Sequence, residues 1–379
     1  MDDNIKIAIL GAGHAGFAHA ADLSMKGFEV SLYEVPEMAH TISVVKERGG
    51  IELYPDPSTG LKGGYSPVHL ITDDAEVAIQ GAEVLFVVVP AFAQAAFAKR
   101  IARHVRSEQI VVLSPGNFGG AVTFAAALKQ NGCSELPVLC EAQSMMYACR
   151  KKGDEAIQIF GYKHGLGVAV FPARLTDMVI PKLQEVFPTV QAAPNILWTW
   201  LSNPNAIGHP PPTILNAGWI EQTDGNFLFY VEGMSPSVLK VMEDLDNERM
   251  AVGKALGLEL TPHNQMGKIW YGHQGYQGST FRDKERNPVY ASIKAESKLD
   301  SRYLTEDIPF GLVPLEDLGK LVGVDMPICT SLINLANSLL RRDFRQTGQS
   351  MGKIGLGHLT VAQLKQFVEE GYSQTPGLT

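Results

Sequence analysis

The chain has 379 residues, and at about 150 residues per domain this length is enough for two domains. Hydrophobic residues make up 45% of the sequence and charged residues 19%, which is typical of a globular protein with a buried core. The 32 lysines and arginines against 40 aspartates and glutamates leave a net charge of -8, which argues against a nucleic-acid partner because its phosphates would be repelled.

The same sequence offers no sign of a metal site, a secretion signal or a membrane span. None of the four cysteines belongs to a C-x-x-C pair, so we expect buried thiols in a reducing cytosol rather than a zinc site. The N-terminus carries Asp2 and Asp3 where a signal peptide needs positive charge. The most apolar stretch, VLFVVVPAFAQAAFA, is interrupted by Pro90 and Gln94 and is too short to cross a bilayer. These features predict a cytoplasmic protein.

The first 120 residues alternate between short apolar runs and helical spacing. Four runs that we interpret as strands cover residues 6–10, 30–33, 84–89 and 110–113. Runs this apolar are typical of a parallel sheet buried on both faces, and a helix is expected over residues 15–26. The alternation predicts an α/β domain with a doubly wound parallel sheet of the Rossmann type. We assign it to residues 1–194, where residues 156–172 should add a pair of short strands.

From about residue 195 the apolar runs disappear and helical spacing takes over. Ser235 is a good N-cap, Pro236 suits the first helical position and Gly257 suits the end, so a long helix is expected between them. Another helix is expected over residues 327–342, and the polar, glycine-rich residues 272–290 predict a long loop. Residues 195–379 are therefore assigned to a second, mostly α-helical domain.

A glycine motif follows the first predicted strand directly and opens the first helix. Gly11, Gly13 and Gly16 fit G-x-G-x-x-G, in which they allow a tight turn, the approach of a pyrophosphate and close packing of helix on strand. The helix N-terminus then presents free N–H groups to the phosphates. His14 lies inside this loop and is a candidate contact to the cofactor. In this context the motif predicts a dinucleotide site rather than an ordinary glycine-rich turn.

Glu34 ends the second predicted strand, at the distance from the glycines where a ribose-binding acid is expected. A carboxylate there accepts hydrogen bonds from both hydroxyls of the adenosine ribose and repels a 2′-phosphate. No arginine occurs in the following residues VPEMAH. The sequence therefore predicts NAD rather than NADP, and the alternative is a solvated strand end.

Histidine is a common acid/base in hydride transfer because it titrates near neutral pH. Among ten histidines, His209 stands out because it lies in NPNAIGHPPPTILNAG, near the start of the second domain. On spacing alone, a structural histidine remains the favoured interpretation.

The chain also resembles the opine dehydrogenases, the octopine/nopaline dehydrogenase family. The histidine segment NPNAIGHPPPTILNAG and the acidic segment EDIPFGLVP at residues 306–314 carry the most specific likeness. GAGHAG, VVVPAF, SPGNFGG and MYACR match in the family's order over nearly the whole chain. The resemblance implies NADH-dependent reductive condensation of an amino acid with a 2-oxo acid such as pyruvate.

The resemblance also implies roles for individual residues. His209 is the acid/base, Asp307 orients it and favours the imidazolium, and Glu306 is the rival to Asp307. Arg302 matches the family's carboxylate-binding arginine, with a surface salt bridge as the alternative. The remaining candidates are Arg150 and Asn205 for the substrate, although Asn205 could simply cap a helix, and Ala15, Pro90 and Gly116 for the cofactor.

The sequence is also compatible with two other functions. Enzymes like glycerol-3-phosphate dehydrogenase or ketopantoate reductase also join a Rossmann domain to a helical one, but they usually rely on a lysine. No lysine setting here is as specific as the segments around His209 and Asp307. A non-enzymatic NAD-binding sensor would need the glycine loop and no acid/base pair. The expected partners are small molecules, and a homodimer is left open.

Overall fold

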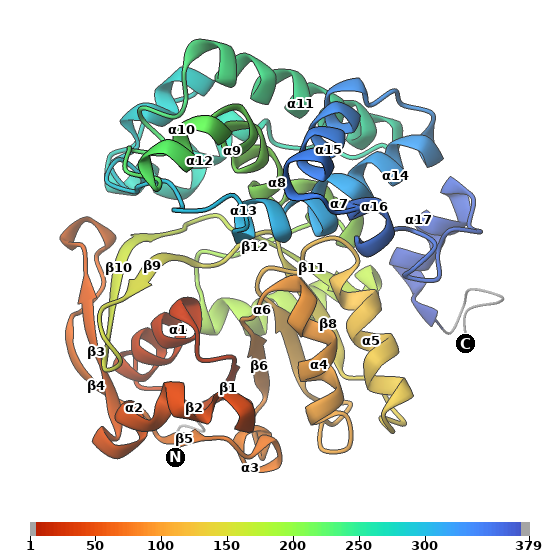
Figure 1. Ribbon diagram of the computed structural model, residues 1–379. Helices are drawn as coiled ribbons and strands as arrows, with labels where there is room; N and C mark the ends of the chain where they lie inside the picture. Colours follow the sequence, from red (N-terminus) through yellow and green to blue (C-terminus); the bar gives the residue numbers. More distant parts are fainter. Residues whose placement is uncertain (1–4, 373–379) are drawn as a thin grey trace. The chain divides into compact units, whose positions relative to one another are not determined.

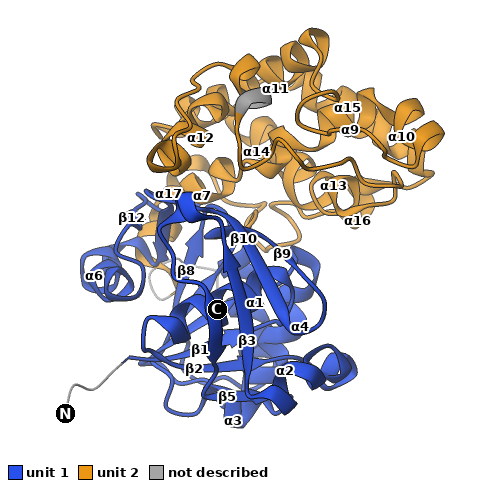
Figure 2. Cartoon of the chain, turned by 90° about the vertical axis from the view of Figure 1, so that its left-hand side faces the viewer, with its two compact units in different colours: residues 1–116, 120–196 blue, residues 117–119, 197–379 orange. Residues whose placement is uncertain are grey.

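The computed structural model describes residues 5–372, apart from the side chains of residues 284–286. It divides into two compact units (Figure 2), one formed by residues 1–116 and 120–196 and the other by residues 117–119 and 197–379. The first unit is α/β and the second is helical. The predicted fold class, a Rossmann-like parallel sheet followed by a helical domain, is confirmed.

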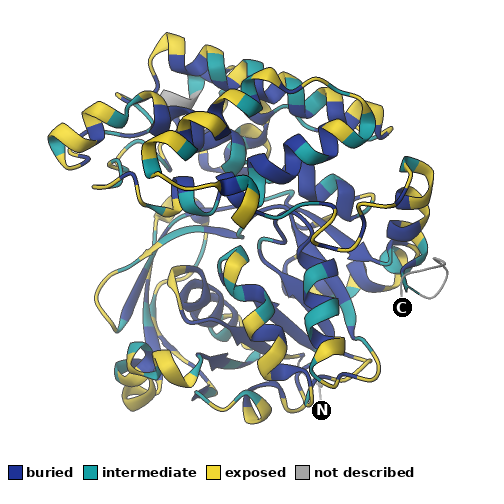
Figure 3. Ribbon diagram, turned by 45° about the vertical axis from the view of Figure 1, so that its right-hand side comes forward, coloured by how far each residue is buried: buried dark blue, intermediate teal, exposed yellow. Residues whose placement is uncertain are grey.

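The first unit is built on an eight-stranded sheet of order β12-β11-β8-β7-β6-β1-β2-β5. Neighbouring strands are parallel, except that β11 runs antiparallel to β8. Its strands are β1 (Lys6–Leu10), β2 (Glu29–Tyr33), β5 (Leu70–Thr72), β6 (Val84–Val87), β7 (Ile110–Leu113), β8 (Val138–Ala142), β11 (Gly167–Phe171) and β12 (Gln191–Ala192). Every residue of β6 and β7 is buried (Figure 3), as expected for central parallel strands.

Helix α1 (His14–Met25) contacts β1 and β2 on one side and a second sheet, of order β4-β3-β10-β9, on the other (Figure 1). The strands of this smaller sheet are β3 (Gly50–Pro55), β4 (Gly64–Pro67), β9 (Tyr147–Lys151) and β10 (Ala156–Tyr162). The other helices of the unit are α2 (Ser43–Arg48), α3 (Ala75–Ile79), α4 (Ala91–Ile101), α5 (Gly120–Gln130) and α6 (Thr176–Val186). The start of α1 is thus covered by strands that come from a distant part of the chain.

The prediction that residues 156–172 form a pair of strands was wrong in its pairing. Both halves are strands, but β10 pairs with β3 and β9, whereas β11 pairs with β8 and β12. Burial explains the separation. All five residues of β11 are buried, which suits the large sheet, whereas β10 keeps partly exposed positions such as Gln158 and Phe160.

The second unit consists of helices, with α11 (Pro236–Ala255) packed against α9 (Pro210–Leu215), α14 (Val313–Val322) and α15 (Pro327–Leu340). The Ser235 side chain accepts the N–H of Val238 at 3.5 Å, and Gly257 follows the helix with a φ of 72°, so both predicted ends are close to the observed ones. The other helices are α7 (Ile196–Ser202), α8 (Asn205–Gly208), α9 (Pro210–Leu215), α10 (Ala217–Thr223), α12 (His263–Tyr271), α13 (Arg302–Thr305), α14 (Val313–Val322), α15 (Pro327–Leu340), α16 (Phe344–Thr347) and α17 (Val361–Glu370).

Two segments of this unit depart from a plain helix or loop. The predicted loop over residues 272–290 contains two short 3₁₀ turns, Gly272–Gln274 and Phe281–Arg286. A single π turn, Ile308–Leu312, joins α13 to α14. Such turns often occur at functional sites, and this one begins directly after Asp307. Among residues 5–372, no helix is both long and apolar enough to cross a membrane.

Candidate functional site

The glycine loop of the first unit has the backbone that a dinucleotide requires. Gly11 has a φ of 104°, and a Cβ there would lie 2.4 Å from Val89 Cγ1. A Cβ on Gly16 would lie 1.8 Å from the carbonyl oxygen of Gly11, so this glycine is needed for α1 to pack on the loop. Gly13 is different, because no atom lies within 4 Å of the position its Cβ would take. No side chain caps α1, so its first N–H groups are not taken up by a capping side chain and fit a pyrophosphate.

Glu34 lies beside this loop, at the end of β2. Its Oε2 accepts the N–H of Ala12 at 2.8 Å, and its Oε1 accepts the N–H of Val35 at 2.9 Å. The side chain is buried, with 9% of the residue exposed. Each carboxylate oxygen has two lone pairs, so the held carboxylate keeps the capacity to accept ribose hydroxyls.

A lysine that the sequence analysis missed lies over the same helix. Lys151 Nζ is 3.4 Å from the centre of the Phe17 ring, and its backbone N–H donates to Nδ1 of His14 at 2.9 Å. Burial lowers the pKa of Lys151 to about 8, although the nearby carboxylates of Asp154 and Glu34 act in the opposite direction. Since 137 residues separate His14 from Lys151, no local spacing could have revealed this contact.

The other cofactor candidates lie at the ends of parallel strands or in α1. Pro90 precedes α4 just after β6, and Ala15 is buried in the first turn of α1. Gly116 follows β7, where a Cβ would lie 2.5 Å from the side chain of Glu141. Arg150, a candidate for the substrate rather than the cofactor, lies on β9 and is exposed. Ligands in open α/β sheets bind beyond the carboxyl ends of the strands, which suits Pro90 and Gly116.

In the second unit the structure brings together two predicted residues that are 98 positions apart. His209 Nδ1 and Asp307 Oδ2 are 2.7 Å apart, and their side chains are only 15% and 9% exposed. His209 lies between α8 and α9, and Asp307 lies at the start of the π turn. A Cβ on Gly311 would lie 2.8 Å from the Cβ of Ala206, so this glycine lets the two segments approach closely.

Two tyrosines, which the sequence analysis missed, complete the surroundings of His209. The Tyr230 hydroxyl lies 2.9 Å from His209 Nε2, so both ring nitrogens have a partner. The Tyr303 ring stacks on the imidazole, with 4.0 Å between ring centres and 13° between ring planes. Burial raises the pKa of Tyr230 well above its usual value, so its phenol is protonated at neutral pH. Tyr303 lies four residues before Asp307, but no signal in the sequence singled out Tyr230.

The predicted substrate residues of this unit have different surroundings. Arg302 begins α13, and its side chain is 56% exposed, with Nη1 3.8 Å from Glu306 Oε2. Asn205 begins α8, where its N–H donates to Oδ1 of Asn203 at 3.0 Å. The long and exposed ion pair of Arg302 is weak, so its guanidinium remains available to another carboxylate.

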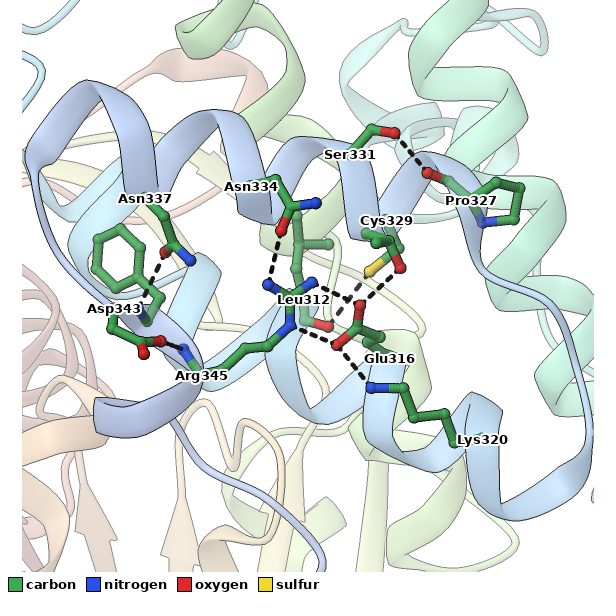
Figure 4. A network of polar contacts seen from close by, with 12 residues as sticks. Leu312, Glu316, Lys320, Pro327, Cys329, Ser331, Asn334, Asn337, Asp343 and Arg345 are labelled. Carbon is green, nitrogen blue, oxygen red and sulfur yellow. Dashed lines mark hydrogen bonds and ion pairs between the residues drawn. The ribbon is translucent and has the colours of Figure 1, made fainter.

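A second polar network stabilises the helices next to the π turn (Figure 4). Glu316 on α14 accepts hydrogen bonds from Arg345 at 2.7 and 2.8 Å, from Thr330 at 2.6 Å and from Lys320 at 3.1 Å. Arg345 is the main cause that lowers the pKa of Glu316 to about 2. Cys329 Sγ donates to the carbonyl oxygen of Leu312 at 3.3 Å, which connects this network to the turn after Asp307. No cluster of three or more metal-ligating side chains occurs among the residues described.

Comparisons with known protein families and relatives show which proteins this chain is similar to. Residues 192–340 match the NAD/NADP octopine/nopaline dehydrogenases, in their alpha-helical domain, and residues 6–115 match the N-terminus of NAD-dependent glycerol-3-phosphate dehydrogenase. An opine dehydrogenase from Arthrobacter sp. (strain 1C) is 35% identical over 369 residues, covering 97% of this chain and 100% of the relative. A vitopine synthase from Allorhizobium ampelinum is 28% identical and covers 93% and 96% of the two chains.

Solved structures show the same fold over nearly the whole length. An octopine dehydrogenase solved with NADH and L-arginine has a TM-score of 0.74 at 20% identity, covering 95% of this chain and 98% of that one. A yersinopine dehydrogenase bound to NADP+ has a TM-score of 0.69 at 16% identity, covering 98% and 99%. The likeness therefore includes both the α/β part and the helical part.

Proposed function

The chain belongs to the opine dehydrogenase family and is an NAD-dependent oxidoreductase that acts on the CH–NH group of its donors, and from this premise we propose its reaction and the residues that perform it. The reaction is the reductive condensation of an amino acid with a pyruvate-like 2-oxo acid, together with its reverse. The observation that carries the proposal is the 2.7 Å contact between His209 and Asp307, both largely buried.

The proposed chemistry has two stages, loss of water, which needs a proton, and reduction by hydride. The neutral amine of the amino acid adds to the carbonyl of the oxo acid, and the resulting carbinolamine, protonated on its oxygen, loses water to give a protonated imine. When bound, NADH supplies the hydride that reduces the imine carbon to a secondary amine. His209 donates the proton that the departing oxygen needs, from Nε2, which is the ring nitrogen that Asp307 does not occupy.

Asp307 acts on the reaction through His209. A carboxylate can only accept, so the hydrogen bond at Nδ1 fixes the proton on that nitrogen and sets the orientation of the ring. Its negative charge also stabilises the imidazolium, which is the acid required for reduction. In the reverse reaction the neutral imidazole takes the proton back.

Arg302 is the proposed anchor for a substrate carboxylate. A guanidinium binds a carboxylate through two parallel hydrogen bonds, and such a clamp orients the substrate for attack. The support is its exposed side chain, whose 3.8 Å pair with Glu306 is weak and can be exchanged. Arg150 and Asn205 remain secondary candidates for substrate binding.

For the cofactor, we propose NADH in preference to NADPH, because the Glu34 carboxylate would repel a 2′-phosphate. The N–H groups at the start of α1 would hold the pyrophosphate, and Lys151 adds a cation beside the same turn. His14, Ala15, Pro90 and Gly116 are the remaining candidates, with His14 already bonded to the backbone of Lys151.

The other readings have less support. Membership of an enzyme family sets aside a non-enzymatic sensor, and the match to glycerol-3-phosphate dehydrogenase is confined to residues 6–115. A reductase of the ketopantoate type would share the fold but would act on an oxo acid alone, without an amino acid as second substrate. We also propose a cytoplasmic location, because the four free thiols suit a reducing compartment. A homodimer is a further proposal, to be tested by measuring the oligomeric state.

The test is a panel of amino acid and 2-oxo acid pairs, each mixed with purified protein and NADH. Oxidation of NADH that needs both substrates is expected, and the product should be a secondary amine by mass spectrometry. Oxidation with an oxo acid alone would favour a hydroxy-acid dehydrogenase instead. Turnover by His209→Asn at nearly the original rate would refute the proposed acid/base residue.

A further inference from the structure

Tyr230 occupies the nitrogen of His209 that the proposed reaction needs. Its hydroxyl is 2.9 Å from Nε2, the position from which a proton would pass to the substrate. The other edge of the ring is held by Asp307, and one face is covered by Tyr303 at 4.0 Å between ring centres. Both nitrogens of the imidazole therefore have a partner before any substrate is present, and a substrate that hydrogen-bonds to Nε2 must replace the phenol.

A phenol suits this position because it can either donate or accept a hydrogen bond. With neutral His209, the proton lies on Nδ1 toward Asp307, and the Tyr230 hydroxyl donates to Nε2. With the imidazolium, Nε2–H donates to the phenol oxygen, and the phenol proton turns toward Tyr303, with which Tyr230 also shares a hydrogen bond. Both protonation states of His209 thus keep all their hydrogen bonds.

From these contacts we propose that Tyr230 is a positioning residue that holds the Nε2 edge of His209 in the substrate-free enzyme and yields it to the bound substrate. The inference rests on the proposed role of His209 as acid/base. It adds a role for a residue whose hydroxyl acts only through the imidazole.

Removing the Tyr230 hydroxyl should destabilise the imidazolium and the neutral imidazole of His209 by different amounts. A hydrogen bond to a charged group is stronger than one between neutral groups, so the imidazolium loses more than neutral histidine in Tyr230→Phe. The midpoint of a pH profile that reports the substrate-free enzyme should therefore move to lower pH in Tyr230→Phe. Once substrate replaces the phenol, this difference should disappear.

The groups that surround the imidazole define what the experiment must control. Those in direct contact are Asp307, Tyr230 and Tyr303. Other titratable or charged side chains on neighbouring elements are Tyr290, next to the Tyr230 ring; His263, next to Gly208; Arg302 and Glu306 on or after α13; and the buried Asp246–Arg249 pair on α11.

Tyr290 is a matched control, because its hydroxyl bonds to that of Tyr271 at 2.9 Å, and its ring is 5.0 Å from the Tyr230 ring.

The experiment compares the original protein, Tyr230→Phe and Tyr290→Phe in two measurements. Reductive kcat/KM against pH reports the free enzyme, and kcat against pH reports the complex. Tyr230→Phe should lower the midpoint of the kcat/KM profile and leave that of the kcat profile nearly unchanged, whereas Tyr290→Phe should move neither. Equal shifts in both profiles, no shift in Tyr230→Phe, or the same shift in Tyr290→Phe would overturn the inference.

Nitrogen NMR of histidine-labelled, substrate-free protein separates this inference from the proposed function, because it needs no turnover. The His209 signals, assigned by their absence in His209→Asn, should titrate at lower pH in Tyr230→Phe. If they do while His209→Asn remains active, the proposed acid/base role fails and the contact stands. If Tyr230→Phe does not fold, the original protein still decides the matter, since an Nε2 signal typical of a nitrogen without a hydrogen bond would overturn the inference.

Discussion

Replacing Asp307 by asparagine tests the central pair most directly. The substitution keeps the size of the side chain and removes its charge. Because the imidazolium is the acid in the reductive direction, Asp307→Asn should lower the reductive rate at neutral pH. The oxidative rate should suffer less, because that direction uses neutral His209.

The size of the loss follows from the geometry. The 2.7 Å separation of Nδ1 and Oδ2 is typical of a charge-assisted hydrogen bond. Such a bond contributes about 1.5–3 kcal/mol, which at 1.36 kcal/mol per tenfold change corresponds to roughly 10- to 100-fold. Solvent screens the pair little, since the two side chains are 15% and 9% exposed. The loss should remain below that of His209→Asn, for which removal of the acid itself costs on the order of 10²–10⁴ in kcat.

The assay is the initial rate of NADH consumption at saturating substrates over roughly pH 5–8, where histidine titrates. The reductive rate of the original protein should fall as pH rises, and in Asp307→Asn this fall should begin at lower pH. NADH binding, followed by fluorescence, should be unchanged. An unaltered pH profile, or a larger shift in Glu306→Gln than in Asp307→Asn, would refute the pairing of His209 with Asp307.

Three further predictions concern the substrate anchor, the cofactor and stability. Arg302→Lys keeps the charge but loses the planar fork, so KM for one substrate should rise about tenfold or more while NADH affinity stays the same. An unchanged KM for both substrates would show that Arg302 does not bind a substrate carboxylate. Glu34→Ala should narrow the preference for NADH over NADPH in direct titrations, and tighter NADPH binding by the original protein would contradict the assignment. The folded-state pKa of Glu316 is lowered to about 2 from 4.5, so its contribution of about 3 kcal/mol is complete above pH 4.5 and is lost as pH falls toward 2. Glu316→Gln should therefore lower the free energy of unfolding at pH 7 by at least that amount, with a difference that shrinks in acid, whereas Lys320→Met, at a 66% exposed side chain, should cost less than about 1 kcal/mol.

Elements with local sequence signals could be predicted before the fold was known. The G-x-G-x-x-G loop, the uniformly apolar strands and the ends of α11 at Ser235 and Gly257 are each specified within a few residues. Local steric and capping rules decide such features without reference to the rest of the chain. The segments around His209 and Asp307 were also recognisable, but by their resemblance to a family, since nothing in their spacing links residues 98 positions apart.

Contacts between distant segments depend on the folded arrangement of the whole chain. β10 and β11 are adjacent in sequence, yet they pair in different sheets, because pairing depends on which edge and how much burial each sheet offers. Lys151 reaches the start of α1 only because β9 belongs to the sheet that covers this helix.

The same is true of the side chains around the imidazole. Tyr303 is brought to His209 by the segment that carries Asp307, whereas Tyr230 comes from the irregular chain before α11 and has no periodic pattern to mark it. A hydrogen bond between side chains requires a heavy-atom separation of about 3 Å, and only the packing of several elements can fix such a distance. The sequence thus identified the acid/base candidate, while the fold determined what holds each of its two nitrogens.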